Sequence, residues 1–255
     1  AAKLSDKDLA ETYGQVYDYA VRHFANSIIP ESADVYGEQA LSSDFRQAVK
    51  KKVSDARLNS FSIVLATNPM LSFIERGRLD FLKLALRKQP DFNKFSQKYH
   101  WLQNNYLADK FLDVKYFKAE LRRLTKDQTK PEIIKEISAL SAKPRKLRRE
   151  QTEIQKILKM SSEMKLIFEL LRLYSKWIDE RKFGALRMVY FIDALLNEVS
   201  RQVKISKIKL GYYLPEELQK LLISGRGRLT DKELRERRKL SVYVTTAERK
   251  PFKEY

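Results

Sequence analysis

The segment Leu71–Tyr106 reads LSFIERGRLDFLKLALRKQPDFNKFSQKYHWLQNNY and carries the strongest structural signal in the chain. Its first half, residues 74–87, spaces apolar residues at helical intervals and predicts an amphipathic helix. Its second half gathers Phe95, Tyr99, Trp101 and Tyr106 around His100. A solvent-facing loop does not concentrate so much ring surface. The segment therefore indicates either the aromatic core of a helical fold or the lining of a binding cleft.

The rest of the chain favours an all-α, bundle-like fold. Among 255 residues there are only seven glycines and seven prolines, and good helix formers dominate. Residues 58–65 are compatible with a strand or a buried helix, and Lys143-Pro144 is expected to interrupt a long helical pattern. We expect one helical domain over residues 1–239. Residues 35–53 are expected to form a loop that enters a helix, and residues 91–106 a helix that leads into a turn. The other predicted helices span approximately 6–26, 74–87, 114–124, 131–142, 147–177, 178–203, 215–224 and 231–239.

The C-terminal residues break this helical pattern. Residues 240–246, LSVYVTT, alternate and are rich in β-branched side chains, which predicts a short strand. A lone strand has no evident partner within a helical domain. Residues 240–255 are therefore interpreted as a strand and linker that lead towards a further domain.

The formal net charge is +18, with local peaks of Lys and Arg at residues 50–52, 143–149 and 235–239. This charge is compatible with nucleic acid, an anionic ligand or an acidic partner domain. The chain lacks the sequence signatures of the common nucleic-acid-binding modules. A basic helical module that binds nucleic acid therefore remains an alternative function.

The composition also argues against several chemistries. There is no cysteine, which excludes disulfides and thiolate catalysis, and the two histidines are far apart in sequence. We expect no metal, no cofactor and no catalytic residue within this chain. The absence of a long apolar run and of an N-terminal signal favours a cytoplasmic protein without a membrane partner.

The candidate ligand-binding residues come from two regions. The aromatic segment supplies rings that would hold an apolar ligand, and a basic stretch around Trp177 supplies arginines that would bind a phosphate or carboxylate. The competing interpretation is that the rings are plain core and that the arginines form salt bridges between helices. The predicted site residues are Tyr99, His100, Trp101, Tyr106, Arg172, Arg181 and Arg187.

Two blocks resemble a known family. Residues 65–86, LATNPMLSFIERGRLDFLKLAL, are followed by KYHWLQNNYL at 98–107 and FKAELRRL at 117–124. The second block is DERKFGALRMVYFIDALLNEVSRQVKISKIKLGYYLPEELQKLL at 179–222, followed by LRERRKLSVYVTTAERKPFKEY at 234–255. Together they resemble the central helical region of PEP-utilising enzymes, a group that includes phosphoenolpyruvate synthase, pyruvate phosphate dikinase and rifampicin phosphotransferase.

The resemblance implies a function for a piece of a larger protein. Such enzymes phosphorylate a histidine on a swivelling domain with the help of an ATP-grasp domain, and neither domain has a counterpart in this sequence. The chain is thus expected to be the helical domain alone, without catalytic machinery. Its implied role is to bind a small-molecule acceptor or to act as a scaffold. Its implied partners are ATP-grasp and phosphohistidine domains of the same or a partner chain.

Overall fold

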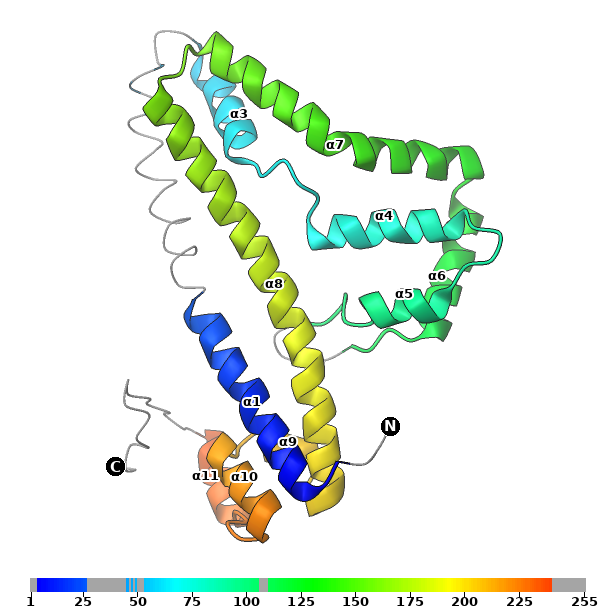
Figure 1. Ribbon diagram of the computed structural model, residues 1–255, viewed down its shortest axis with the longest axis vertical. Coiled ribbons are helices and arrows are strands. Elements are labelled where there is room, and N and C mark those ends of the chain that lie inside the picture. Colours follow the sequence, from blue (N-terminus) through cyan, green and yellow to red (C-terminus); the bar gives the residue numbers. More distant parts are fainter. Residues whose placement is uncertain are drawn as a thin grey trace. The chain divides into compact units, whose positions relative to one another are not determined.

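The computed structural model describes residues 4–26, 45, 47, 49, 53–105 and 110–239, and this part of the chain is all-α. The expected strand at 240–246 and linker at 240–255 lie outside the described residues. Residues 58–65, compatible with strand or helix from sequence, belong to a helix. The helices (Figure 1) are α1 (Asp6–Ala25), α3 (Asp55–Ala66), α4 (Phe73–Ala85), α5 (Phe92–Tyr99), α6 (Val114–Asp127), α7 (Lys130–Ile157), α8 (Ser162–Val203), α9 (Lys207–Leu210), α10 (Pro215–Ser224) and α11 (Asp231–Lys239).

The chain divides into two compact units. The smaller unit comprises Ala1–Tyr19 and Phe191–Tyr255, and the larger comprises Ala20–Tyr190. The helices α1 and α8 contribute residues to both. The sequence predicts one helical domain over 1–239, and the described parts of both units fall within that range.

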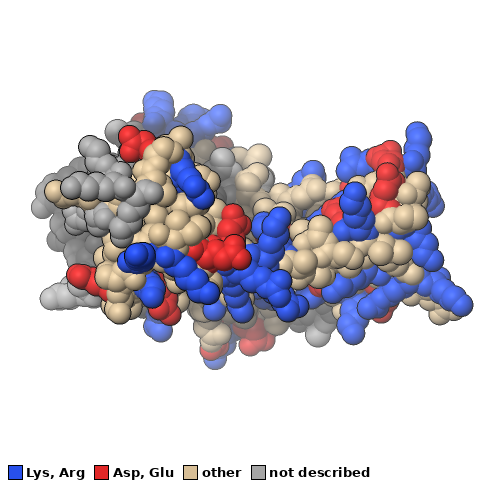
Figure 2. Space-filling view, turned by 90° about the horizontal axis from the view of Figure 1, so that it is seen from above, with Lys and Arg blue, Asp and Glu red and all other residues tan. Residues whose placement is uncertain are grey.

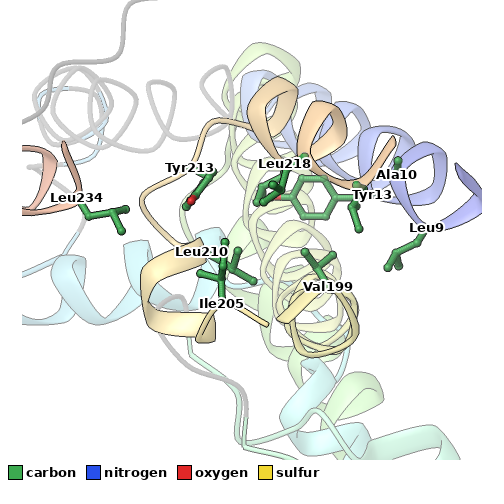
Figure 3. Close-up of a cluster of buried hydrophobic side chains, with 11 residues drawn as sticks. Leu9, Ala10, Tyr13, Val199, Ile205, Leu210, Tyr213, Leu218 and Leu234 are labelled. Atoms are coloured by element: carbon green, nitrogen blue, oxygen red, sulfur yellow. The ribbon is translucent and has the colours of Figure 1, made fainter. Parts of the chain in front are cut away.

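An aliphatic core holds the smaller unit together. Side chains of α1 meet side chains from the end of α8 and from α9, α10 and α11, and they point toward one another (Figure 3). Local signals set the helix ends here. Pro215 begins α10, and Gly225, with φ 66°, ends it in the left-handed conformation that favours glycine. The core residues are Leu9, Ala10, Tyr13, Val199, Ile205, Leu210, Tyr213, Leu218, Leu221, Leu222 and Leu234.

The larger unit has two buried clusters. One is aromatic and lies among α4, α5 and α6; α4 also packs on α7. The other joins α3 to the end of α7 and the start of α8, and it includes Phe45 and Val49. The first cluster comprises Phe73, Phe81, Leu82, Leu84, Phe95, Tyr99, Trp101, Leu112, Phe117, Leu124 and Ile133.

Pro144 does not interrupt α7, contrary to the sequence-based expectation. The helix continues through it and bends near its middle (Figure 1). Proline removes one backbone hydrogen bond and costs about 3 kcal/mol in a helix interior. The packing of α7 against both α3 and α4 supplies the burial that offsets this cost.

The break between the two longest helices falls at residues 158–161 and not at Trp177. Lys159 adopts φ 45°, while Leu158 and Met160 on either side of it are buried. The Ser161 hydroxyl accepts a hydrogen bond from the Met164 backbone N–H at 3.2 Å, which caps the new helix. The helix α8 then runs without interruption to Val203, so the expected separate helices at 147–177 and 178–203 are wrong.

Candidate ligand-binding cavity

A cavity of about 520 Å³ lies in the larger unit between α4, α5 and α8. It contains three of the residues predicted as ligand-binding: Tyr99, Trp101 and Arg187. Whether a ligand binds there stays a prediction. The full lining comprises Phe73, Arg76, Leu79, Asp80, Gln97, Lys98, Tyr99, Trp101, Glu180, Phe183 and Arg187.

Two features position α4 against its neighbours. Ser72 and Glu75 form a capping box at its start, and the Phe73 N–H donates to the Asp179 carboxylate of α8 at 3.1 Å. Gly77 lets the turn after α5 approach closely, because a Cβ there would lie 3.1 Å from Leu102 and 3.4 Å from Tyr99. A Cβ at this position would therefore require the Leu102 side chain to shift by a few tenths of an ångström.

The inner wall of the cavity consists of aromatic rings. Trp101 is only 2% exposed, and its indole N–H donates to the Lys98 carbonyl at 2.9 Å. Its ring centre lies 5.0 Å from that of Phe183, nearly perpendicular to it, and 5.9 Å from that of Phe73. These separations fit the favourable edge-to-face and tilted pairings of aromatic rings. Trp101 is therefore part of the core and borders the cavity at the same time.

A hydrogen-bonded group of polar side chains lies beside these rings. The Asp80 carboxylate accepts from Lys98 Nζ at 2.7 Å and from the Tyr99 hydroxyl at 2.6 Å. Burial alone would raise the pKa of Asp80, but the hydrogen bonds from Lys98 and Tyr99 outweigh it and lower that pKa. Burial, together with the hydrogen bond to Asp80, raises the pKa of Tyr99 to about 12. At neutral pH the group is thus a paired carboxylate and ammonium with a neutral phenol.

The two arginines of the cavity differ in their partners. Arg76 donates to the Glu180 carboxylate at 3.2 Å and lies 3.8 Å from that of Asp179. Arg187 is exposed and lies over the Phe183 ring, 5.4 Å from its centre. It forms no ion pair with any described residue. Arg187 is therefore the cation of this cavity whose charge no described carboxylate offsets.

The other predicted arginines do not line the cavity. Arg172 donates from Nη1 to the Leu65 carbonyl at 2.9 Å, so it joins α8 to the end of α3, and burial lowers its pKa. Arg181 is 9% exposed, and its carbonyl lies 3.0 Å from the His23 Nε2. The ring of His23 packs directly on the Cα of Gly184, where a Cβ would lie 2.7 Å from it. His23 and Arg181 thus take part in the contact of α1 with α8.

His100 and Tyr106 complete the predicted set. His100 ends α5, its ring centre lies 4.1 Å from that of Tyr190, and its Nδ1 lies 3.2 Å from the carbonyls of Ser96 and Gln97. It packs beside the aromatic cluster and does not line the cavity. Tyr106 lies outside the described residues.

Several lining residues were not predicted. Phe73, Arg76 and Asp80 come from α4, and Phe183 and Glu180 come from α8. One usable signal was present, because Arg76 and Asp80 lie four residues apart and Phe183 and Arg187 do likewise, so each pair shares a helix face. The approach of α4 to α8, more than a hundred residues later in the chain, leaves no such local signal.

Two other recesses have less suitable linings. In the smaller unit, a recess of about 370 Å³ includes Lys209, which pairs with Asp231 at 2.7 Å, and Arg228, which donates to the Val203 carbonyl at 2.7 Å. Along α7, a shallow recess of about 700 Å³ includes the cationic residues Arg145, Arg148, Arg149 and Lys156 and no aromatic side chain. These four form no ion pair with any described residue. Figure 2, seen from above Figure 1 and thus onto α7, shows Lys and Arg side chains gathered there.

No family model, curated protein or solved structure matches this chain. Within the described ranges, no helix is long and apolar enough to cross a membrane. The same residues contain no group of three or more histidine or carboxylate side chains that could hold a metal ion. The function proposed next therefore relies on the cavity and on the resemblance noted from the sequence.

Proposed function

We propose that this chain is the helical domain of a phosphotransferase similar to phosphoenolpyruvate synthase, and that it binds an acceptor substrate in the cavity between α4, α5 and α8. It carries no catalytic group of its own and acts with ATP-grasp and phosphohistidine domains of the same or a partner chain. The cytoplasm is the proposed compartment. The observation that supports binding is the meeting of aromatic rings and Arg187 in one cavity.

The charges of the cavity suggest the kind of ligand. Lys98 is neutralised by Asp80, and Arg76 by Glu180, so Arg187 remains to attract an anion. A planar guanidinium binds phosphate and carboxylate through two parallel hydrogen bonds. The Phe183 ring, which is partly exposed and lines the same cavity, would contact an apolar body. The favoured ligand therefore has a flat apolar part and one acidic group.

Calorimetric titration with 1-naphthyl phosphate, which combines these two features, tests the proposal. We expect Arg187→Ala to weaken binding roughly tenfold, which corresponds to about 1.4 kcal/mol. Arg122→Ala is the matched control, because Arg122 is also an exposed helical arginine and lies outside the cavity lining. Equal binding by the two variants would exclude Arg187 from the site and contradict the assignment.

A labelling experiment tests the absence of catalysis. Incubation of the chain with radiolabelled ATP or phosphoenolpyruvate should leave the protein unlabelled. His100 is the candidate to watch, although its ring packs between Phe111 and Tyr190. Stoichiometric label on His100 would show a phosphorylated intermediate within this chain and would overturn this part of the proposal.

The shallow recess along α7, with its cationic residues Arg145, Arg148, Arg149 and Lys156, favours one alternative function, a module that binds nucleic acid. Its unpaired cations would contact backbone phosphates, and affinity would fall steeply with salt as counterions are released. Replacing Arg145, Arg148 and Arg149 by Gln should then weaken binding to a 20-base-pair duplex far more than the same change at Lys232, Arg235 and Arg238. Both triple variants have the same net charge, so equal losses would mean general attraction and would argue against this alternative.

A further inference from the structure

An exposed apolar stripe runs along the first half of α8. Leu166, Leu170, Leu173 and Trp177 follow one another at spacings of four, three and four residues. Each is between 41% and 56% exposed. These spacings place the four side chains in one line on a helix, as at the a and d positions of a coiled coil. Single exposed leucines are ordinary, but a continuous line rimmed by charges is typical of a protein–protein contact.

We propose that this stripe is a self-association surface, on which α8 of a second copy of the chain packs antiparallel. The argument for a second copy comes from the exposed charges that flank the stripe. Glu169 and Lys176 are seven residues apart, so they occupy equivalent positions on the same side of it. Neither forms an ion pair with any described residue. The charge of Glu169 also acts on Arg172 of the same helix, but without an ion pair. The stripe therefore has one negative and one positive side chain on a single edge.

Antiparallel packing satisfies both the apolar and the charged groups. A two-fold axis midway between Leu170 and Leu173 places Leu170 against Leu173 of the second copy and Leu166 against Trp177 of the second copy. The same axis also brings Glu169 close to Lys176 of the second copy. Their positions along the paired helices differ by two residues, which is about 3 Å. Two symmetric ion pairs result, as an isologous interface requires.

Parallel packing does not satisfy the same charges. In a parallel pair, this edge of one helix faces the opposite edge of the other, five residues further along. Lys176 would then face Arg181, which is a second cation and is buried. Glu169 would face Tyr174, which carries no charge to match it. The charges of this one face thus select the antiparallel arrangement.

Sedimentation equilibrium of the full chain over a range of concentrations tests the proposal. We expect a reversible dimer that Leu173→Glu abolishes, since the new carboxylate would lie against Leu170 of the second copy. Ile208→Glu is the control, because Ile208 is 79% exposed in α9 and lies off the stripe. This control should dimerise like the original chain. A chain that is monomeric at every concentration would overturn the proposal.

A charge swap tests the pairing itself. Glu169→Lys and Lys176→Glu should each weaken the dimer roughly tenfold, because each replaces two attractive pairs by two repulsive ones. The double variant restores both pairs and should recover the original affinity. The single variants change the net charge of +18 in opposite directions, to +20 and +16, so general repulsion would affect them in opposite senses. Failure of the double variant to recover would contradict the assigned contact.

Disulfide trapping reports the orientation, since the chain has no cysteine of its own. A mixture of Leu166→Cys and Trp177→Cys proteins should form the mixed disulfide. Each variant alone should not link to itself, because its two copies would be about 16 Å apart along the antiparallel helices. Self-linking of each variant would indicate parallel packing and would overturn the proposed arrangement.

Discussion

The core of the smaller unit and the aromatic cluster of the larger unit contain the same number of buried residues but differ in chemistry. Eleven buried residues form the core of the smaller unit, and only Tyr13 and Tyr213 among them are aromatic. Eleven buried residues also form the aromatic cluster of the larger unit, and six of these carry aromatic rings. Three of these rings, those of Phe73, Tyr99 and Trp101, also border the cavity. Two clusters of equal size thus differ in their ring content, and the aromatic one borders the cavity that we propose as a binding site.

Truncation of a core side chain in each unit should have the largest effect. Trp101→Ala should lower the free energy of unfolding of the larger unit by about 3–5 kcal/mol, and Leu218→Ala that of the smaller unit by about 2–5 kcal/mol. Both residues are almost fully buried. Hydrogen exchange measured on peptides from each unit would show which one loses protection. Equal loss of protection in both units from either variant would show that the two units unfold together. The two cores would then not stabilise their units independently.

The sequence predicts several helix starts in both units because the signals for them are local. Asp113 caps α6 and Pro215 begins α10, which agrees with the predicted helix starts at residues 114 and 215. The course of the chain through Pro144 was not predicted, since the packing that offsets the cost of proline comes from distant helices. The break at Lys159 has no glycine or proline to mark it. Local signals therefore fix the start of a helix better than its continuation.

The cavity was predictable only in part, for the same reason. Tyr99 and Trp101 are conspicuous because they lie in one short aromatic segment. Three arginines of α8 were candidates, and sequence alone could not choose among them, because the choice depends on which face of α8 meets α4. Arg187 lies on that face, while Arg181 is buried near His23 and Arg172 reaches the end of α3.

Alkaline pH should weaken both units, through a different tyrosine in each. Burial, with smaller effects of Tyr17 and Glu216, raises the pKa of Tyr13 to about 12, and the pKa of Tyr99 is also raised to about 12. A folded-state pKa above the ordinary value of 10 gives stability that is present below pH 10 and is lost between about pH 10 and pH 12. For Tyr13 the loss is nearly 3 kcal/mol at most.

Urea unfolding at increasing pH measures these losses. Both tryptophans, Trp101 and Trp177, belong to the larger unit, so tryptophan fluorescence reports on that unit, while circular dichroism reports on the whole chain. Tyr99→Phe should remove part of the pH dependence seen by fluorescence, and Tyr13→Phe should leave that signal unchanged. An effect of Tyr13→Phe on fluorescence would show that the two units are coupled.

Two helical glycines should respond differently to alanine. In the larger unit, Gly184→Ala places a Cβ 2.7 Å from the His23 ring. This ring cannot move freely, because it is also hydrogen-bonded to the Arg181 carbonyl. The substitution should therefore lower the free energy of unfolding by about 2 kcal/mol. In the smaller unit, a Cβ on Gly14 meets the end of the flexible Gln219 side chain. That side chain can turn away, so the lost hydrogen bond to the Ala10 carbonyl is offset by the better helix propensity of alanine.

Denaturant unfolding of the two alanine variants, with the double variant Gly184→Ala, His23→Ala, tests the contact. The double variant should lose less than the sum of its single changes, because removal of the ring relieves the clash. A Gly184→Ala protein as stable as the original would mean that the His23 ring moves aside without cost. The close approach of α1 and α8 would then not depend on glycine.

The smallest effect is expected for two arginine–carboxylate pairs that join different helices through two parallel hydrogen bonds, one pair in each unit. Arg237 donates to Glu217 at 2.7 and 2.8 Å in the smaller unit, and Arg78 donates to Glu136 at 2.8 and 2.9 Å in the larger. The first pair is the less exposed, at 20% and 27% against 38% and 30%. The Glu217 carboxylate also accepts from the Leu214 N–H at the start of α10.

Glu217→Gln should therefore cost about 1 kcal/mol and Glu136→Gln less than about 0.5 kcal/mol. Burial alone would raise the pKa of Glu217, but the hydrogen bonds from Arg237 and Leu214 outweigh it and lower that pKa. Since the folded-state pKa lies below the ordinary value of 4.5, the stabilisation is present above about pH 4.5 and is lost as the pH falls further. The difference between Glu217→Gln and the original chain should shrink on acidification. A larger loss of stability for Glu136→Gln than for Glu217→Gln would show that the exposure of the side chains does not decide which pair stabilises more. The packing of α4 on α7 would then depend on the Arg78–Glu136 pair more than its exposure suggests.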